Sequence, residues 1–474
     1  MKLQKTKYNK DNIKAGIAHI GVGNFHRAHQ AYYTNLILED DSQQNWALCG
    51  IALLEYDAKL VESLKSQNFN YNLLVCGRDG VNEAYEINAI KEVLHNDSQA
   101  ILDKLASPEI KIISMTITEG GYNLDKATGE FNLDNPQVKA DLENPQSPKT
   151  VFGYVAQALR MRMQNGAGAV TILSCDNLQH NGNTAKRVFS SFIKAQDENL
   201  YAWTADNVSF PNSMVDRITP AVREEDRQKI NAEIGVEDLA PIYCEDFIQW
   251  VIEDNFIAGR PAWEKLGVEF TDDVSSYENM KLSLLNASHT LLSYPSFLAG
   301  YRKVDDAMSD PIIINFVKEF MDIDITPYVP APRNIDLEVY KQTLVERFAN
   351  HTVSDQIARL CFDGISKFPV YIMPNLAKML KDKAQLKRLA FLFACYRRYL
   401  ALHIDDNGVD FEVQEPQLSE ADKTIIAEND DLGFLKLSAF NAIDLAEYKE
   451  FVDLYLVMYK KVCENKILDI LKDL

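Results

Sequence analysis

The sequence predicts two domains in tandem: an α/β domain built on a parallel sheet, followed by a mostly α-helical domain. The first reason is length, because 474 residues exceed what one hydrophobic core organises. The second is the alternation of strand-like and helix-like segments in the N-terminal half, which is typical of a parallel sheet covered by helices. The third is the loss of β-rich runs after about residue 275. We therefore expect domains at residues 1–275 and 276–474, with the boundary near FTDDVSSYE (270–278).

The first domain is expected to alternate strand and helix from its start. Short apolar runs bounded by turn residues predict buried strands at 16–23, 46–54, 110–118 and 169–175. Amphipathic spacing predicts helices at 25–39, 149–164 and 183–196. In the second domain the same spacing predicts helices at 277–296, 310–322, 336–349, 353–362, 370–381, 386–402 and 445–472.

Charge and cysteine content exclude several classes of protein. A net charge of −20 argues against a nucleic-acid partner, which requires a basic face. The seven cysteines are scattered and form no Cys-x-x-Cys pair, as in a reduced cytoplasmic protein without disulfides or a zinc site. The N-terminal stretch has no apolar core, so we expect no secretory signal. The longest apolar stretches, 282–300 and 389–404, contain histidine or arginine and predict no membrane span.

The stretch GIAHIGVGNFHRAHQ (16–30) is typical of a strand, a glycine turn and a helix. Gly21 and Gly23 allow a tight turn whose backbone approaches a pyrophosphate, as in Rossmann-like dinucleotide-binding domains. Arg27, in the first helical turn, is a candidate to pair with a phosphate oxygen. His26 stands where the third glycine of the usual motif belongs. The alternative interpretation is an ordinary strand–helix connection.

Two acidic residues follow the second predicted strand, in LLEYDAK (53–59). Glu55 and Asp57 are candidates to accept hydrogen bonds from the adenosine ribose, and a carboxylate there favours NAD by repelling the 2′-phosphate of NADP. They lie further from the glycines than is usual, and ordinary loop acids are the alternative interpretation.

Three polar side chains, Lys281, Asn286 and His289, interrupt the apolar stretch MKLSLLNASH (280–289). On a regular α-helix Asn286 and His289 share a face, with Lys281 about 80° from His289. A helix start and apolar surroundings both lower a lysine pKa, so that the amine can act as a base. The alternative is a surface lysine beside a hydrogen-bonded core asparagine and histidine.

Polar side chains also end two of the predicted strands, where ligands bind in open α/β sheets. At the end of the strand at 110–118 they are Thr116, Thr118 and Glu119. After the strand at 169–175 they are Asp176, Asn177, His180 and Asn181. Ordinary loop chemistry is again the alternative.

Several segments together are specific to one family. They are IAHIGVGNFHRAHQAYYT, SPEIKIISMTITEGGYN, SPKTVFG, SCDNLQHNG, SFPNSMVDRITP, GRPAWEKLGVEFTDDV, YENMKLSLLNASH and DGISKFP. In these segments the chain resembles the polyol-specific long-chain dehydrogenases, whose Lys-x5-Asn-x2-His signature occupies residues 281–289. The resemblance covers roughly residues 15–370 and thins beyond residue 390. One departure is Gln179, where the family usually has proline, in the loop that carries Asn177.

The resemblance implies a metal-independent enzyme that uses NAD to interconvert D-mannitol and D-fructose by hydride transfer at C2. Lys281 is then the general acid/base, His289 orients the substrate carbinol, and Glu278 gates proton exchange between Lys281 and solvent. Asn177 and Asn286 hold the reacting oxygen in an oxyanion hole.

The other implied residues bind the cofactor and the substrate. The cofactor set is Gly21, Gly23, Phe25, Arg27, Asp57, Thr118 and Glu119. The set for the remaining substrate hydroxyls is Asp216, Arg359 and Lys367. No metal ligand is implied, which agrees with the lack of clustered cysteine and histidine in the sequence. The family also implies a monomer whose partner is a small polyol or ketose.

Three other interpretations of the sequence compete with this one. Within the family, a mannonate:fructuronate oxidoreductase is the rival, because Arg359 and Lys367 suit a hydroxyl or a sugar-acid carboxylate. A catalytically inactive sugar- or nucleotide-binding protein on the same fold is disfavoured by the joint presence of the lysine, asparagine and histidine of the signature. Short-chain dehydrogenases share the Tyr-x-x-x-Lys pattern found at 122–126 and 277–281, but the glycine pattern and the length do not fit them.

Overall fold

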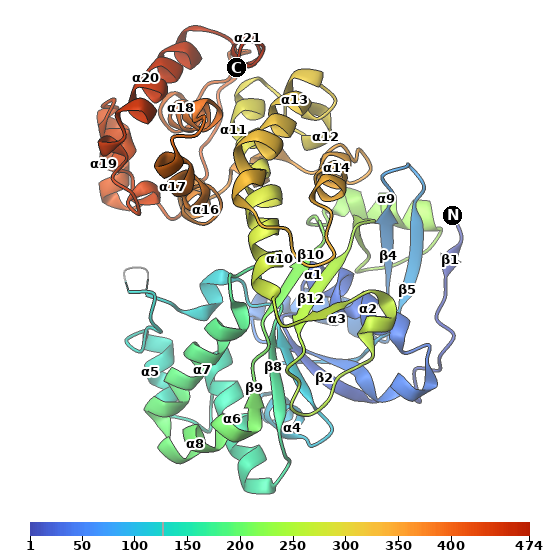
Figure 1. Cartoon of the computed structure of the whole chain (residues 1–474). Helices are drawn as coiled ribbons and strands as arrows, with labels where there is room; N and C mark the ends of the chain where they lie inside the picture. Colours follow the sequence, from blue (N-terminus) through green and yellow to red (C-terminus); the bar gives the residue numbers. More distant parts are fainter. Residues whose placement is uncertain (126–127) are drawn as a thin grey trace. The chain divides into compact units, whose positions relative to one another are not determined.

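The computed structural model describes residues 1–125 and 128–474 and divides the chain into two units, Met1–Ser275 and Ser276–Leu474. Figure 1 shows the sheets in the first unit and the helices that make up the second. The prediction of an α/β domain followed by a mostly α-helical one is therefore confirmed. Each unit is described below by itself.

Six parallel strands form the central sheet of the first unit. In spatial order they are β6 (Ile90–His95), β3 (Ala47–Ala52), β2 (Ala15–Ile20), β7 (Ile112–Met115), β8 (Val170–Ser174) and β9 (Val208–Ser209). The chain runs outward from β2 through β3 to β6, then returns to the other side of β2 with β7. The strand order thus reverses between β2 and β7, which is the arrangement of the doubly wound dinucleotide-binding fold.

Both faces of this sheet are buried, which is why its strands are continuous apolar runs rather than alternating ones. Ala18 belongs to one core and its neighbour Ile17 to the other, since successive side chains of a strand point to opposite faces. The first core includes residues of α4 (Ser98–Ala106), α6 (Val151–Asn165), α7 (Asn181–Gln196) and α8 (Glu198–Asn207). The second includes residues of α1 (Asn24–Ala28), α2 (Gln30–Ile37) and α3 (Ala58–Ser66).

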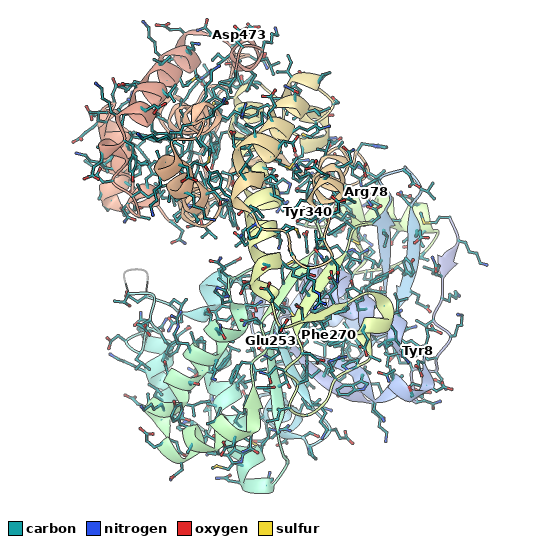
Figure 2. All side chains as sticks on the ribbon, viewed as in Figure 1. Tyr8, Arg78, Glu253, Phe270, Tyr340 and Asp473 are labelled. Atoms are coloured by element: carbon teal, nitrogen blue, oxygen red, sulfur yellow. The ribbon has the colours of Figure 1, made fainter. Side chains whose placement is uncertain are left out.

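Two smaller sheets complete the first unit, and the sequence did not predict them. One pairs β1 (Leu3–Gln4), β5 (Glu83–Ile87), β4 (Tyr71–Cys76) and β11 (Ile242–Glu245) in that order. The other pairs β10 (Ser213–Asp216), β12 (Gln249–Glu253) and β13 (Glu269–Thr271). Glu253 and Phe270, labelled in Figure 2, lie on the adjacent strands β12 and β13. The remaining helices are α5 (Pro136–Glu143) and α9 (Glu224–Ile234).

The second unit is helical, and among its residues, all of which are described, no strand is assigned. Its central helix is α18 (Lys387–Leu402), which is buried along nearly its whole length and packs against α11 (Ala287–Leu298) and α20 (Lys449–Glu464). The other α-helices are α10 (Val274–Met280), α12 (Val304–Ala307), α13 (Pro311–Glu319), α14 (Leu337–Phe348), α15 (Ile357–Cys361), α16 (Gly364–Tyr371), α17 (Met373–Asp382), α19 (Glu420–Glu428) and α21 (Ile467–Leu471). Throughout the described part of the chain, every helix is too short or too polar to cross a membrane.

Candidate active site

The central sheet brings candidate residues from distant parts of the sequence to its carboxyl end. Because the strands are parallel and adjacent, the carboxyl ends of β3, β2, β7 and β8 lie side by side there. Asp57 follows β3, Gly21 follows β2, Thr118 follows β7 and Asn177 follows β8. In this class of fold, ligands bind outside the carboxyl ends of the strands, at the point where the strand order reverses.

The glycine turn after β2 is closed on one side and open on the other. Gly21 has a φ of +99°, and a Cβ at this position would lie 2.2 Å from the carbonyl oxygen of Thr116. Only glycine therefore fits there. A Cβ at Gly23, by contrast, would meet no atom within 4 Å. The turn can thus pack against β7 and still offer backbone to a phosphate group.

A buried histidine explains why the third glycine of the usual motif is missing. The ring of His26 stacks on that of His19, with centroids 3.5 Å apart. Burial lowers the pKa of His19 to about 3 and the pKa of His26 well below its usual value, so both rings are neutral. His19 Nε2 lies 3.0 Å from the carbonyl oxygen of Gly21 and joins it in a hydrogen bond. The pair therefore supports the glycine turn from within the unit.

Arg27 lies in the first turn of α1, as predicted, but its guanidinium makes internal contacts. Its side chain is buried, with Nη1 donating to the carbonyl oxygen of Ala240 at 2.7 Å and Nη2 to Asn24 at 2.7 Å. Its guanidinium also lies over the ring of Tyr71. These contacts hold α1 against the residues before β11, so the guanidinium of Arg27 is engaged within the unit instead of being free to bind the predicted phosphate. Phe25, two residues earlier, is half-buried and stacks on His29.

The signature of the second unit lies on an interrupted helix, where the sequence predicted a regular one. Residues Lys281–Asn286 form a π-helical segment between α10 and α11. Five residues on an α-helix would separate Lys281 and Asn286 by roughly 140°. The i→i+5 bonding of a π-helix instead places residues five apart on nearly the same side, and such segments frequently occur at functional sites.

The interruption also changes the electrostatic argument for the lysine. The helix begins at Val274, so Lys281 lies beyond its first turn. The helix macrodipole acts mainly within that first turn. The prediction that a helix start lowers the pKa of Lys281 is therefore wrong. Lys281 and Glu278 are both buried.

Hydrogen bonds to α17 and to α10 hold Ser283 of the π-helical segment in place. Ser283, within the segment, accepts a hydrogen bond from Asn375 at 2.8 Å and donates one to Asn279 at 3.2 Å. Ser283 and Asn375 are both buried. Asn286 Oδ1 is also buried and has no hydrogen-bond partner among the described residues. The segment therefore combines an anchored serine side chain with a buried acceptor oxygen that has no partner among the described residues.

Three further candidates lie close together in the second unit. Arg359 pairs with Asp355, with Nε donating to Oδ1 at 2.8 Å. Burial raises the pKa of Asp355, but the hydrogen bond and charge of Arg359 and the nearby His289 hold it below its usual value. Lys367 donates to the carbonyl oxygen of Leu360 at 2.9 Å, and burial followed by the charge of Arg359 lowers its pKa. Helices α11, α15 and α16 thus gather a histidine and two cations.

The last substrate candidate, Asp216, lies at the end of β10 in the first unit, where it is buried. Asp216 thus belongs to the first unit, whereas Arg359 and Lys367 belong to the second. Glu119, from the predicted cofactor set, begins a short 3₁₀ turn after β7 and is exposed.

Glu415 is a candidate that the sequence did not reveal. Its carboxylate accepts hydrogen bonds from the backbone amides of Gly364 and Ile365 and from the hydroxyl of Tyr396, each at 3.0 Å. It thereby caps the start of α16, the helix that carries Lys367. No local signal identifies this role, because Glu415 lies about 50 residues from the amides that it binds.

The buried carboxyl group of Glu415 should make the stability of the protein depend on pH. Burial raises the pKa of Glu415 to about 7, so the folded protein binds this proton more tightly than the unfolded chain does. Its contribution to the free energy of unfolding is present at low pH and is lost as the pH rises through about 7. The free energy of unfolding of Glu415→Gln, taken relative to that of wild type, should therefore rise by on the order of 1–3 kcal/mol from pH 5 to pH 8. Urea unfolding at the two pH values measures this gain, and the exposed Glu412→Gln should show none.

Comparison with known proteins places these features in context. Residues 15–265 match the model of the mannitol dehydrogenase Rossmann domain, and residues 273–463 match that of the mannitol dehydrogenase C-terminal domain. A polyol:NADP oxidoreductase of Gluconobacter oxydans is 41% identical over 471 residues, which are 98% of this chain and 96% of the relative.

Two solved structures are similar over nearly the whole chain. One is Pseudomonas fluorescens mannitol 2-dehydrogenase in a ternary complex with NAD and D-mannitol, with a TM-score of 0.90 and 41% identity, covering 100% of this chain and 96% of that one. The other is a D-sorbitol dehydrogenase in substrate-free form, with a TM-score of 0.90 and 40% identity, covering 98% and 96%.

Proposed function

Because the chain belongs to the mannitol dehydrogenase family, we propose that this oxidoreductase transfers a hydride between NAD and C2 of a polyol, interconverting D-mannitol and D-fructose. The observation that carries the proposal is the combination of two features within one chain. A glycine turn occupies the reversal point of the central sheet, and the Lys-x5-Asn-x2-His signature occupies a π-interrupted helix.

Residues of the first unit fit a dinucleotide. Gly21 closes the turn, the open side at Gly23 admits a phosphate group, and Thr118 and Glu119 follow the neighbouring strand. Phe25 lies in the helix that starts at this turn. Asp57 follows β3, where a carboxylate binds the ribose hydroxyls of NAD and repels the extra phosphate of NADP.

The proposed chemistry uses residues of the signature to manage a proton and a charge. When bound, NAD supplies the hydride acceptor. Lys281, as a neutral amine, takes the proton of the substrate hydroxyl, and Glu278 relays it to solvent. His289 orients the carbinol by a hydrogen bond. Asn286 donates to the oxygen as negative charge develops on it, which is the function of an oxyanion hole; Asn177 has the same proposed role.

The remaining polar residues would recognise the other hydroxyls of the substrate. Asp216 accepts hydrogen bonds from them, and Arg359 and Lys367 donate. A sugar acid is the second candidate substrate, because burial lowers the pKa of Lys367 and Arg359 lies close enough for its charge to lower that pKa further. Two adjacent cations would bind a carboxylate by charge-assisted hydrogen bonds.

A substrate panel tests the proposal directly. Fructose, fructuronate, tagaturonate and xylulose should be reduced in parallel assays with NADH and with NADPH, and kcat/KM compared. The highest value for fructose with NADH is expected. A clear preference for fructuronate would identify a mannonate oxidoreductase instead. Absence of turnover with every substrate, despite cofactor binding, would indicate an inactive binding protein.

The cofactor preference should depend on Asp57. Asp57→Ala removes the carboxylate that repels a 2′-phosphate, so NADH should bind more weakly and the preference for NADH over NADPH should decrease. Fluorescence titration with both cofactors measures the two Kd values. Glu55→Ala is the variant to compare with Asp57→Ala, because Glu55 is the other candidate carboxylate of this turn and is more exposed. A wild-type protein that used NADPH better than NADH would contradict this assignment.

Activity should survive metal removal, because a lysine rather than a metal-bound group is proposed to take the alcohol proton. In the described part of the chain, no three His, Cys, Asp or Glu side chains are grouped to hold a metal ion. Mannitol oxidation should proceed at the same rate before and after prolonged dialysis against EDTA. A loss of activity that added Zn²⁺ restores would refute the mechanism.

A further inference from the structure

We propose that Asp176 is a positioning residue that holds the loop after β7, residues 117–122, in the conformation that the cofactor site requires. The inference rests on the proposed function in one respect, namely that Thr118 and Glu119 of this loop contribute to cofactor binding. Asp176 itself is buried, two residues after the end of β8, and is not expected to touch substrate or cofactor.

The carboxylate of Asp176 makes three hydrogen bonds, all to this loop. Oδ1 accepts from the backbone amide of Thr118 at 2.8 Å, and Oδ2 accepts from that of Ile117 at 3.1 Å. Oδ2 also accepts from the hydroxyl of Tyr122 at 2.8 Å. One side chain thus binds the loop at its beginning and at its end.

The loop needs such a constraint because its backbone is strained. Thr118 has φ 62° and ψ 166°, a region that is essentially restricted to glycine. A residue with a side chain held there costs about 1–3 kcal/mol, and the conformation persists only where its surroundings enforce it. A hydrogen bond from the strained amide to a buried carboxylate provides that enforcement, since charge-assisted hydrogen bonds are about twice as strong as neutral ones.

The backbone of Asp176 is itself held by hydrogen bonds to Ser174 and Asn181. Its backbone amide donates to Ser174 Oγ at 3.3 Å, and Asn181 Nδ2 donates to its carbonyl oxygen at 3.1 Å. Ser174 Oγ lies 2.5 Å from the Tyr122 hydroxyl. Asn177, the proposed oxyanion-hole residue of this unit, is the next residue along the chain. The carboxylate therefore couples the loop after β7 to the loop after β8.

The group has the charge that this role requires. Burial raises the pKa of Asp176 to about 6, although its three hydrogen bonds oppose this rise, and the charge of Glu119 adds to it. The carboxylate is therefore ionised at pH 7.5, where the experiments below are best done.

Asp176→Asn is the central variant, because it keeps the shape but replaces one accepting oxygen with a donor. We expect the Kd for NADH to rise about 10-fold, and amide hydrogen exchange within residues 117–122 to accelerate. Asp238→Asn is the matched control. Asp238 is also buried in the first unit and accepts backbone amide bonds, from Asn72 and Ala240, but it contacts no residue of the loop in any of its hydrogen bonds.

A glycine substitution separates a positioning role from general destabilisation. In the Asp176→Asn background, Thr118→Gly should return hydrogen exchange within residues 117–122 part of the way to the wild-type rate, because glycine adopts this backbone conformation without strain. If Asp176→Asn does not fold, Tyr122→Phe replaces it: loss of one of the three hydrogen bonds should raise the Kd by about 2–3-fold and speed exchange in the same loop.

The outcomes are distinct. Selective exchange in the loop, weaker NADH binding and rescue by glycine support the proposal. Equal effects of Asp176→Asn and Asp238→Asn on the loop and on Kd would overturn it, as would no rescue by glycine. A wild-type protein that binds no NADH would refute the proposed function instead, and loop exchange alone would then decide whether Asp176 holds the loop.

Discussion

Replacing Lys281 with alanine should lower kcat/KM for mannitol oxidation by about 10²–10⁴-fold, the usual contribution of a positioned acid–base group. The reason is that the alcohol proton then has no acceptor at the reacting oxygen. NADH affinity should stay near that of wild type. Lys381→Ala, which removes an exposed lysine of α17, should leave the rate near wild type. Added primary amines should restore part of the activity of Lys281→Ala.

The pH profiles of the two directions provide the sharpest check on this role. Alcohol oxidation requires the neutral amine, so kcat/KM for mannitol should fall as the pH decreases and the lysine becomes protonated. Carbonyl reduction requires the ammonium ion, so kcat/KM for fructose should fall as the pH increases. The two curves should be opposite and share one ionisation. If Lys281→Ala retains wild-type rates and the same pH dependence, another residue is the base, and His289 is the first to test.

Replacing Asn286 with alanine should lower kcat by about 10²–10³-fold, the usual cost of losing one oxyanion-hole donor. The donor acts as negative charge develops on the oxygen, so kcat should change much more than the Kd for NADH. Asn286→Asp should be at least as damaging, because a carboxylate near the developing charge repels it.

Ser288→Ala is the matched control for Asn286. Ser288 is fully buried two residues further along the same helix, and its hydroxyl has no hydrogen-bond partner among the described residues. Its removal should leave kcat near wild type. A loss in Asn286→Ala that Ser288→Ala shares, or one that appears only in NADH affinity, would show that Asn286 acts through the packing of the helix.

Much of the central sheet was predictable because its strands are buried on both faces. The strand predicted at 169–175 is observed as Val170–Ser174, and the helix predicted at 183–196 is observed as Asn181–Gln196. The smaller sheets were not predictable in the same way. The strand β13 has three half-buried residues, and such a short segment carries no periodic signal.

The π-helical segment shows where periodicity stops being informative. An α-helix and a π-helix differ by one residue in their hydrogen-bond spacing, so over Lys281–Asn286 the apolar pattern fits both. In the structure, Ser283 of this segment accepts a hydrogen bond from Asn375 of α17, a partner 92 residues away that the local sequence does not contain.

The sequence by itself determined the two-domain fold class, four strands of the central sheet, the family, and the chemical groups that follow those strands, because these depend on residues close together along the chain. Only the tertiary structure decided which of those groups are committed to internal contacts. Arg27 stands where a phosphate ligand is expected, yet it binds the carbonyl oxygen of Ala240, 213 residues away. Asp176 resembles any loop acid until Thr118 and Tyr122, more than 50 residues away, are seen to donate to it. The physical reason is that a buried polar group must find a partner, and the fold rather than the neighbouring sequence supplies that partner.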